Sequence, residues 1–200
     1  MKSQTKQTMN NKTNSNLAFK SGIFYVISSI FVKCIVIITT PIFTRILSTK
    51  EYGMVANFNS WSSLLQVICT LNLTYSIGRA KLDFPQKLDK YIGAMQCLSL
   101  IFSLIISVIL LINFEVLSVV MELNKEFLVF LIIYVCFSPA ILFVQNGYRY
   151  EYKYKKNIAI AWYTSISTVS LSILLILFIN RNNALLRIIG IVLPTVVLSL

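Results

Sequence analysis

The pattern of hydrophobic positions divides this chain into six long apolar runs separated by short polar and charged segments. The runs cover residues 21–43, 54–78, 91–113, 127–146, 158–179 and 185–200. Most reach the roughly 20 residues that a helix needs to cross a hydrocarbon core about 30 Å thick. They are too long for strands and lack the alternation of a membrane β-barrel. We therefore predict about six transmembrane helices, because a helix satisfies its own backbone hydrogen bonds inside a membrane.

Composition favours a membrane protein over a soluble one. Charged residues make up 12% of the chain and the mean hydropathy is +0.75, whereas soluble domains carry about twice that fraction of charge. The first 20 residues are polar and basic and contain no signal-peptide core. The last run is still apolar at Leu200, so we expect a chain cut short. The sequence predicts a tail (1–20) followed by an all-α integral membrane bundle (21–200).

The distribution of lysine and arginine predicts the orientation of this bundle. With a cytoplasmic N-terminus, twelve cations fall in inside segments and five in outside segments. The outside cations are Arg45, Lys50, Lys125, Arg181 and Arg187. Because inside loops are enriched in lysine and arginine, we expect a multi-pass protein of the cytoplasmic membrane with its N-terminus inside. The net charge of +11 is then a topology signal, and we expect no nucleic-acid partner.

The chain offers few residues for metal or acid–base chemistry. It has no histidine, and its four cysteines lie singly in four different runs without the spacing of a zinc or redox motif. Every carboxylate falls in a loop or at the edge of a run. We therefore expect no metal and no cofactor, and no buried carboxylate for coupling to protons or sodium.

A single lysine, Lys33, lies near the middle of the first apolar run. A charge at that depth costs roughly 2.5–3.5 kcal/mol on insertion scales, so it persists where the protein interior is polar or wet. Lys33 therefore indicates a hydrophilic cavity. The alternatives are that its ammonium is bonded to backbone carbonyls or that its stem carries it toward an interface.

Polar residues in the second run recur at helical spacing. They are Asn59, Ser63, Gln66, Thr70 and Thr74. At about 100° per residue these positions share one stripe, which faces protein or water rather than lipid. In the first run Ser29 and Thr40 lie close to the face of Lys33, so both runs are predicted to line one cavity. In the third run Gln96 and a serine stripe (Ser99, Ser103, Ser107) share another narrow face, which favours close helix packing instead.

Several segments resemble one family of transporters. Residues 40–53 read TPIFTRILSTKEYG, and the likeness continues through Asn59-Ser60-Trp61, through the Tyr/Lys-rich residues 148–155, and at Arg187, Gly190 and Pro194. These segments resemble the bacterial polysaccharide exporters, the lipid-linked oligosaccharide flippases of O-antigen and capsule assembly. That family belongs to the multidrug/oligosaccharidyl-lipid/polysaccharide exporter superfamily.

The resemblance implies an N-terminal half of a pseudo-symmetric transporter of 12–14 helices whose second bundle is missing here. It implies a flippase, not an enzyme, that moves undecaprenyl-diphosphate-linked repeat units across the membrane. Its partners would be that substrate, membrane lipids and other polysaccharide-assembly proteins. Lys33 would bind the diphosphate and Arg45 would lie near the outer mouth, unless Arg45 stabilises the turn with Glu51. Asn59, Gln66 and Thr70 would offer hydrogen bonds to sugar.

Two other functions compete with this interpretation. A drug or cation antiporter of the same superfamily would share the fold but would require an intramembrane carboxylate. An integral-membrane polysaccharide polymerase or ligase would ordinarily carry a large outer loop, whereas the outer loops here are short. The Tyr/Lys segment at 148–155 fits an interfacial belt, with docking of a diphosphate as the alternative.

Overall fold

The computed structural model describes residues 2–179 and 182–199, with side chains from Phe19 onward except Pro85. This part of the chain is all-α, as the sequence predicts. Its helices are α1 (Lys2–Ile46), α2 (Thr49–Thr70), α3 (Ser76–Asp83), α4 (Leu88–Ile112), α5 (Phe114–Val120), α6 (Lys125–Tyr150), α7 (Tyr154–Ile179) and α8 (Asn183–Ser199). Two 3₁₀ turns, η1 (Leu73–Tyr75) and η2 (Pro85–Lys87), flank α3.

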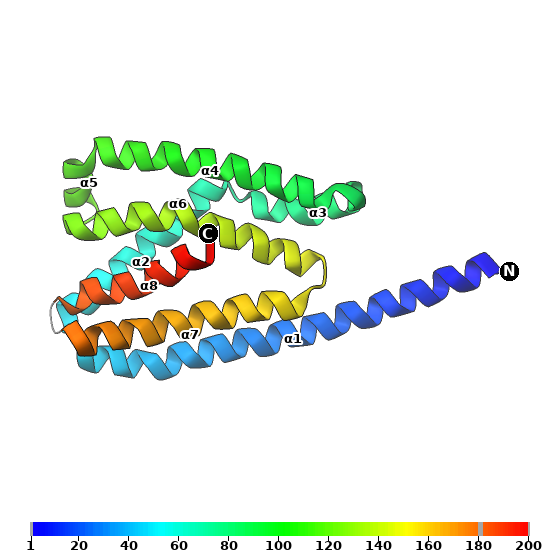
Figure 1. Cartoon of the computed structure of the whole chain (residues 1–200), viewed down its shortest axis with the longest axis horizontal. Helices are drawn as coiled ribbons and strands as arrows, with labels where there is room; N and C mark the ends of the chain where they lie inside the picture. Colours follow the sequence, from blue (N-terminus) through cyan, green and yellow to red (C-terminus); the bar gives the residue numbers. More distant parts are fainter. Residues whose placement is uncertain (1, 180–181, 200) are drawn as a thin grey trace.

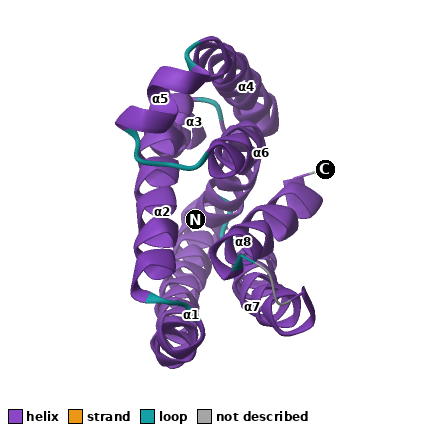
Figure 2. Cartoon of the chain, turned by 90° about the vertical axis from the view of Figure 1, so that its left-hand side faces the viewer, coloured by secondary structure: helices purple, strands orange, loops and turns teal. Residues whose placement is uncertain are grey.

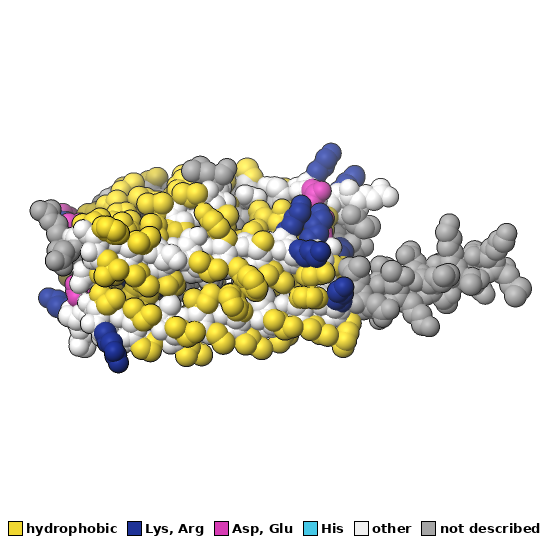
Figure 3. Space-filling model, turned by 60° about the horizontal axis from the view of Figure 1, so that its bottom comes forward, with side chains coloured by type: hydrophobic (Ala, Val, Ile, Leu, Met, Phe, Trp, Pro, Cys, Tyr) yellow, Lys and Arg dark blue, Asp and Glu magenta, His cyan; other side chains and the backbone are white. Residues whose placement is uncertain are grey.

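The long helices run back and forth between two ends of an elongated bundle (Figure 1). We call one end the corner end, where α1 turns into α2, α5 lies and α8 begins. We call the other the elbow end, where α3 lies and α6 turns into α7. A broad hydrophobic band separates the two ends, and cations gather beyond it at the elbow end (Figure 3).

Charge is divided between the two ends as the orientation predicts. The loops and helix ends at the elbow end carry Arg79, Lys81, Lys87, Lys90, Arg149, Lys153, Lys155 and Lys156. The corner end carries Arg45, Lys50 and Lys125 on its surface, together with most of the carboxylates. Arg181, another predicted outside cation, lies outside the described residues. The elbow end is therefore the end that the positive-inside bias assigns to the cytoplasm.

Four helices in the described chain, rather than six, are long and apolar enough to cross a membrane. They are Phe19–Ile46 of α1, and α4, α6 and α7. The predicted second run, 54–78, is wrong as a single span. Helix α2 stops at Thr70 because Leu71 and Asn72 adopt left-handed conformations (φ 46° and 55°). Its 22 residues include Asn59, Ser63, Gln66 and Thr70 of the polar stripe, whereas Thr74 lies in η1.

The other differences concern where helices begin and end. Helix α8 has 17 residues and is a shorter apolar helix. At about 1.5 Å per residue, α8 measures about 25 Å and α2 about 33 Å. Of these two helices, only α2 has the length of a bilayer core. Helix α1 begins at Lys2, so the backbone of the predicted tail continues the first helix instead of forming a separate segment.

The turn between α1 and α2 is fixed by a capping box. The Ser48 backbone N–H donates to Glu51 Oε2 at 2.8 Å, and the Glu51 N–H donates back to Ser48 Oγ at 3.3 Å. The Glu51 carboxylate also lies near the backbone N–H groups of Asn183 and Ala184, which help to lower its pKa. Glu51 thereby holds the start of α2 against the start of α8, which is a different role from the predicted pairing with Arg45.

The main core lies between α2, α4, α6 and α8. Helix α2 buries Val55, Phe58, Ser62, Leu65 and Cys69, whose spacing of three and four residues keeps them on one face. Helix α6 is central in the bundle. In its most apolar segment 39% of the residues are buried, whereas the corresponding share is 11% in α1 and in α7.

The serine stripe of α4 packs against its neighbours, as predicted. Ser99 Oγ donates to Cys69 O at 3.0 Å and Ser103 Oγ donates to Val135 O at 3.2 Å. Small hydroxyl side chains allow the helices to approach closely and still satisfy their polar atoms. This stripe is therefore structural.

Helices α1 and α7 form a second layer beside that core (Figure 2). The Phe31 and Trp162 rings lie 4.4 Å apart, and Trp162 Nε1 donates to Ser28 Oγ at 3.1 Å. Helix α8 joins the layers, because Gly190 lets its backbone approach Ser172 of α7. On the remaining side the α1–α7 pair faces α2 and α6, and this side contains the candidate site.

Candidate functional site

Three neighbouring cavities lie where α1 and α7 face α2, α6 and α8. The corner cavity, about 270 Å³, is lined from α1, α2, α7 and α8. The central cavity, about 280 Å³, is lined from α2, α6, α7 and α8. The elbow cavity, about 450 Å³, is lined from α1, α6 and α7. We call the three together the polar groove.

Shared side chains connect the cavities of the polar groove. Ser165 and Thr168 line both the corner and central cavities, and Gln145 lines both the central and elbow cavities. Val36 lines both the corner and elbow cavities. The groove therefore extends along much of the bundle, inside the hydrophobic band.

Hydroxyl and amide side chains dominate the polar lining. The corner cavity has Thr39, Thr40, Tyr52 and Asn59, the central cavity has Gln66, Gln145 and Thr164, and the elbow cavity has Ser28, Ser29 and Asn157. Such groups donate and accept hydrogen bonds without carrying charge, as a sugar hydroxyl requires. The charged residues described along the groove are two cations, Lys33 and Arg187, and no carboxylate.

Lys33 lines the elbow cavity at the middle of the apolar part of α1. Its side chain is exposed, and it makes no hydrogen bond or ion pair with another residue that the structure describes. Among the described residues, no backbone carbonyl accepts a hydrogen bond from Lys33. Its ammonium keeps three donors for a ligand or for water.

Arg187 is the second cation and is held in place from three directions. Its Nη1 atom donates to Ser172 Oγ at 2.6 Å and to Thr168 O at 3.2 Å. Its guanidinium carbon lies 4.0 Å from the centroid of the Phe43 ring, a cation–π contact. These contacts use one guanidinium nitrogen and one face, so further N–H donors remain available at the corner cavity.

The geometry of α7 and α8 explains how Arg187 is positioned. Ser172 is fully buried and its hydroxyl also lies 2.5 Å from Thr168 O. A Cβ on Gly190 would lie 2.1 Å from Ser172 Oγ, so only glycine permits this approach. The close contact places Arg187, one turn earlier on α8, within reach of the α7 hydroxyls.

The structure brings three of the five predicted site residues to the groove. Asn59 lines the corner cavity, Gln66 the central cavity and Lys33 the elbow cavity. Thr70 is buried and its hydroxyl donates to Gln66 O at 2.9 Å, so it does not reach the groove. Arg45 is exposed at the corner end and lines none of the three cavities.

Sequence reasoning missed Arg187 and the α7 face. Arg187 was counted among the outside cations and among the residues that resemble the family, but it was given no role in the site. The signal that could have revealed the α7 face is the spacing of Thr164, Thr168 and Ser172, which repeats the four-residue steps of the α2 stripe. A second hydroxyl stripe predicts a second wall of the same groove.

The fold and groove define a class of protein. The described chain is all-α, with four helices that could span a membrane and a polar groove between them, which is the layout of a multi-pass membrane protein. Comparisons of the chain with protein-family models, with curated proteins and with solved structures find no match. The groove and the sequence segments described above therefore carry the functional argument.

Proposed function

We propose that this chain is the N-terminal bundle of a flippase that moves undecaprenyl-diphosphate-linked oligosaccharide repeat units across the cytoplasmic membrane for surface polysaccharide assembly. The observation that carries the proposal is the polar groove, which runs through the hydrophobic band and presents two cations without carboxylate partners. In this proposal the N-terminus is cytoplasmic, and the partners include membrane lipids and other polysaccharide-assembly proteins.

The chemistry of the groove matches the three parts of such a substrate. Hydroxyl and amide side chains replace water around the sugar, so the sugar does not enter the bilayer core unsolvated. The ammonium of Lys33 and the guanidinium of Arg187 attract the diphosphate. At an effective dielectric of about 20, two unit charges 4 Å apart interact by about 4 kcal/mol. The lipid tail remains in the bilayer, and no covalent bond is made or broken.

The same cations argue against a drug or cation antiporter. A cationic substrate would enter a groove whose described charges are Lys33 and Arg187, and it would gain no carboxylate contact there.

A polymerase or ligase would need a catalytic surface at the corner end. The described connections there are short, for example 121–124 between α5 and α6. Transport of an anionic, sugar-bearing lipid is the function that these observations favour.

Lys33 provides the decisive experiment because its side chain is exposed and its replacement removes no hydrogen bond or ion pair with a described residue. In the intact protein in its own cells, Lys33→Met should reduce surface polysaccharide about tenfold or more, since a hydrogen bond to a charged group is worth roughly 1.5–3 kcal/mol. Lys33→Arg should retain part of it, because arginine keeps the charge but not the shape. Polysaccharide is measured per amount of membrane-inserted protein.

Lys50→Met is the matched control, since Lys50 is an exposed cation at the corner end that lines none of the three cavities. It should leave polysaccharide levels unchanged. Normal polysaccharide in cells carrying Lys33→Met would refute the proposed role of Lys33 in substrate binding. Unchanged polysaccharide on deletion of the whole gene, with increased sensitivity to cationic drugs, would favour the antiporter instead.

A further inference from the structure

The turn between α6 and α7 gathers aromatic rings and cations outside the polar groove. We call residues 148–156, together with Lys81 of α3, the elbow. Lys81 Nζ donates to Tyr150 O and lies 4.4 Å from the centroid of the Tyr152 ring. Lys156 and Lys153 lie 5.5 Å and 5.9 Å from the centroid of the Tyr148 ring.

The backbone of the elbow is fixed in an uncommon conformation. Tyr152 has a left-handed conformation with φ 57°, which is unfavourable for a residue with a Cβ. Hydrogen bonds from the Tyr152 N–H to Arg149 O (3.3 Å) and from the Lys153 N–H to Tyr148 O (2.9 Å) close the turn. The Tyr150 ring lies against Gly78 of α3. The lysines are therefore presented on a defined scaffold rather than on a loose loop.

The elbow contains more cations than carboxylates. Glu151 pairs with Lys153 at 2.7 Å, and Asp89 of α4 also acts electrostatically on Lys153. Lys81 and Lys156 make no ion pair with a described residue. Partial burial lowers the pKa of Lys81, with Glu151 opposing that shift, so an additional anion beside Lys81 would be favourable.

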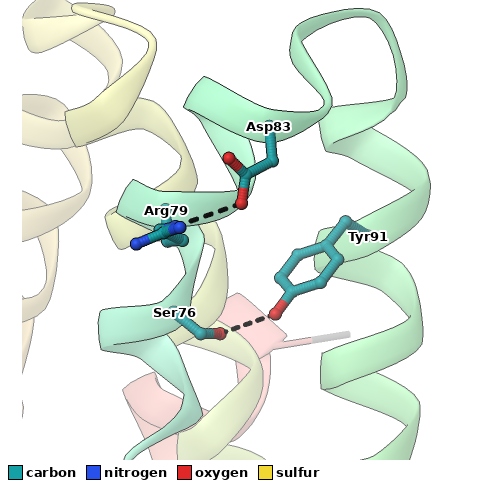
Figure 4. A network of polar contacts seen from close by, with 4 residues as sticks. All are labelled: Ser76, Arg79, Asp83 and Tyr91. Atoms are coloured by element: carbon teal, nitrogen blue, oxygen red, sulfur yellow. Dashed lines mark hydrogen bonds and ion pairs between the residues drawn. The ribbon is translucent and has the colours of Figure 1, made fainter.

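Arg79, a neighbouring cation, differs from Lys81 because it has a carboxylate partner. Arg79 of α3 lies 3.1 Å from Asp83 on the same helix, and Tyr91 of α4 fastens that helix through a hydrogen bond of 2.9 Å to Ser76 (Figure 4). Arg79 is thus already neutralised by a partner one turn away. Lys81 of the same helix has no such carboxylate partner among the described residues.

The elbow connects α6 and α7, two helices that are long and apolar enough to cross a membrane, so in a bilayer it would lie near the headgroups. Beside it, the segment from η1 to η2 exposes large apolar side chains, with Tyr75 75%, Leu82 80% and Phe84 57% exposed. Exposed apolar side chains next to lysines fit an interface, where rings and chains enter the acyl region and cations meet phosphates. This arrangement distinguishes the elbow from a purely aqueous charged surface.

We propose that the elbow is a binding site for an anionic phospholipid of the surrounding bilayer. Lys81 and Lys156 contact the phosphate while the segment containing Leu82 and Phe84 lies beside the acyl chains. The site is separate from the polar groove, and the proposal does not depend on the transported substrate. A phospholipid phosphate and a free phosphate share the same chemistry, but the apolar surroundings select the lipid.

The test measures lipids retained by the purified chain in native mass spectrometry after exchange into bilayer discs of equal phosphatidylglycerol and phosphatidylcholine with identical acyl chains. The elbow variant is K81M/K153M/K156M. The control, K20M/K87M/K90M, removes the same charge from exposed lysines at the same end. Because a lysine near an anionic surface contributes about a fivefold change in binding, the elbow variant should retain phosphatidylglycerol at least about fivefold less than the control.

Each outcome bears directly on the proposal. Equal losses in the two triple variants would show an effect of overall charge and would overturn it. Retention of phosphatidylcholine equal to that of phosphatidylglycerol, or release of the lipid by inorganic phosphate, would also overturn it. Lys156→Met alone should lose part of the retained phosphatidylglycerol; this exposed side chain makes only the ring contact, so the variant remains informative if the triple variant fails to fold.

Discussion

Gly190 of α8 should tolerate no side chain, because α7 lies directly against it. A Cβ at this position would lie 2.1 Å from Ser172 Oγ and 2.8 Å from Ser172 Cα. The hydroxyl cannot simply rotate away, since Ser172 is fully buried and its oxygen bonds Arg187 Nη1 and Thr168 O. The backbone Cα cannot move without the helix. Gly190→Ala must therefore separate α8 from α7 and strain the contacts that hold Arg187.

The expected change in the free energy of unfolding combines two destabilising contributions and one stabilising contribution. Overpacking a tight contact costs about 1–3 kcal/mol. Weakening the hydrogen bonds of the Arg187 guanidinium costs part of the roughly 1.5–3 kcal/mol that such bonds contribute. Alanine regains about 0.8–1 kcal/mol in a helix interior relative to glycine. We expect a net loss of about 2 kcal/mol from the free energy of unfolding, which is about 4–8 °C in melting temperature for a chain of this length.

A thiol-reactive fluorescent maleimide measures this loss in detergent, because Cys69 is fully buried and reacts only on unfolding. Cys34 and Cys97 are exposed and Cys136 is half-buried, so all three are first replaced by serine. Gly93→Ala is the control, since a Cβ there meets nothing within 4 Å, and it should raise stability by about 0.5–1 kcal/mol. A Gly190→Ala protein as stable as the Gly93→Ala protein would show that α7 and α8 do not approach as described.

Three further predictions concern the orientation, the α1–α2 corner and the groove. Cysteine introduced at Ser118 should react with an impermeant thiol reagent in intact cells and cysteine at Gln86 should not; the opposite pattern would reverse the orientation. The pKa of Glu51 is lowered, chiefly by the Ser48 backbone N–H. The ionised carboxylate therefore stabilises the fold at pH values above the ordinary carboxyl pKa, and this contribution disappears as the pH falls through the lowered pKa. The melting temperature should therefore fall more between about pH 5 and pH 3 in the native chain than in Glu51→Gln, and parallel curves would contradict this. In the intact protein, cysteine at Asn59 should react with small water-soluble reagents and cysteine at Leu64 should not, whereas equal protection of both would mean a dry groove.

The sequence predicts the all-α architecture well because long apolar runs have few alternatives. Runs of more than about 20 apolar residues favour helices that satisfy their own backbone, and α4, α6 and α7 follow their runs closely. The prediction fails for 54–78, where apolar residues continue past the end of α2. Hydrophobicity does not predict the left-handed conformations of Leu71 and Asn72, and neither position is a glycine or a proline that would indicate the end of a helix.

Half of the candidate site is likewise visible in the sequence. A charge in the middle of an apolar run identifies Lys33, and helical spacing identifies Asn59 and Gln66. The same stripe also includes Thr70, which is buried and does not reach the groove. Spacing determines the angle of a side chain around its own helix, whereas the neighbouring helices determine whether that face is covered at a given depth.

Arg187 depends most on tertiary structure. Along the chain it is an arginine near the edge of the last apolar run, one of the five cations assigned to outside segments, and its place in the sequence indicates no role in a site. Its position at the groove requires Gly190 to bring α8 against α7, and Phe43 of α1 to lie beneath the guanidinium. Local sequence determined the helices and their polar faces, because hydrogen bonding and hydrophobicity act within each segment. The groove itself was decided by how the α1–α7 pair packs beside α2, α6 and α8, since contacts between different helices have no periodic signature in the sequence.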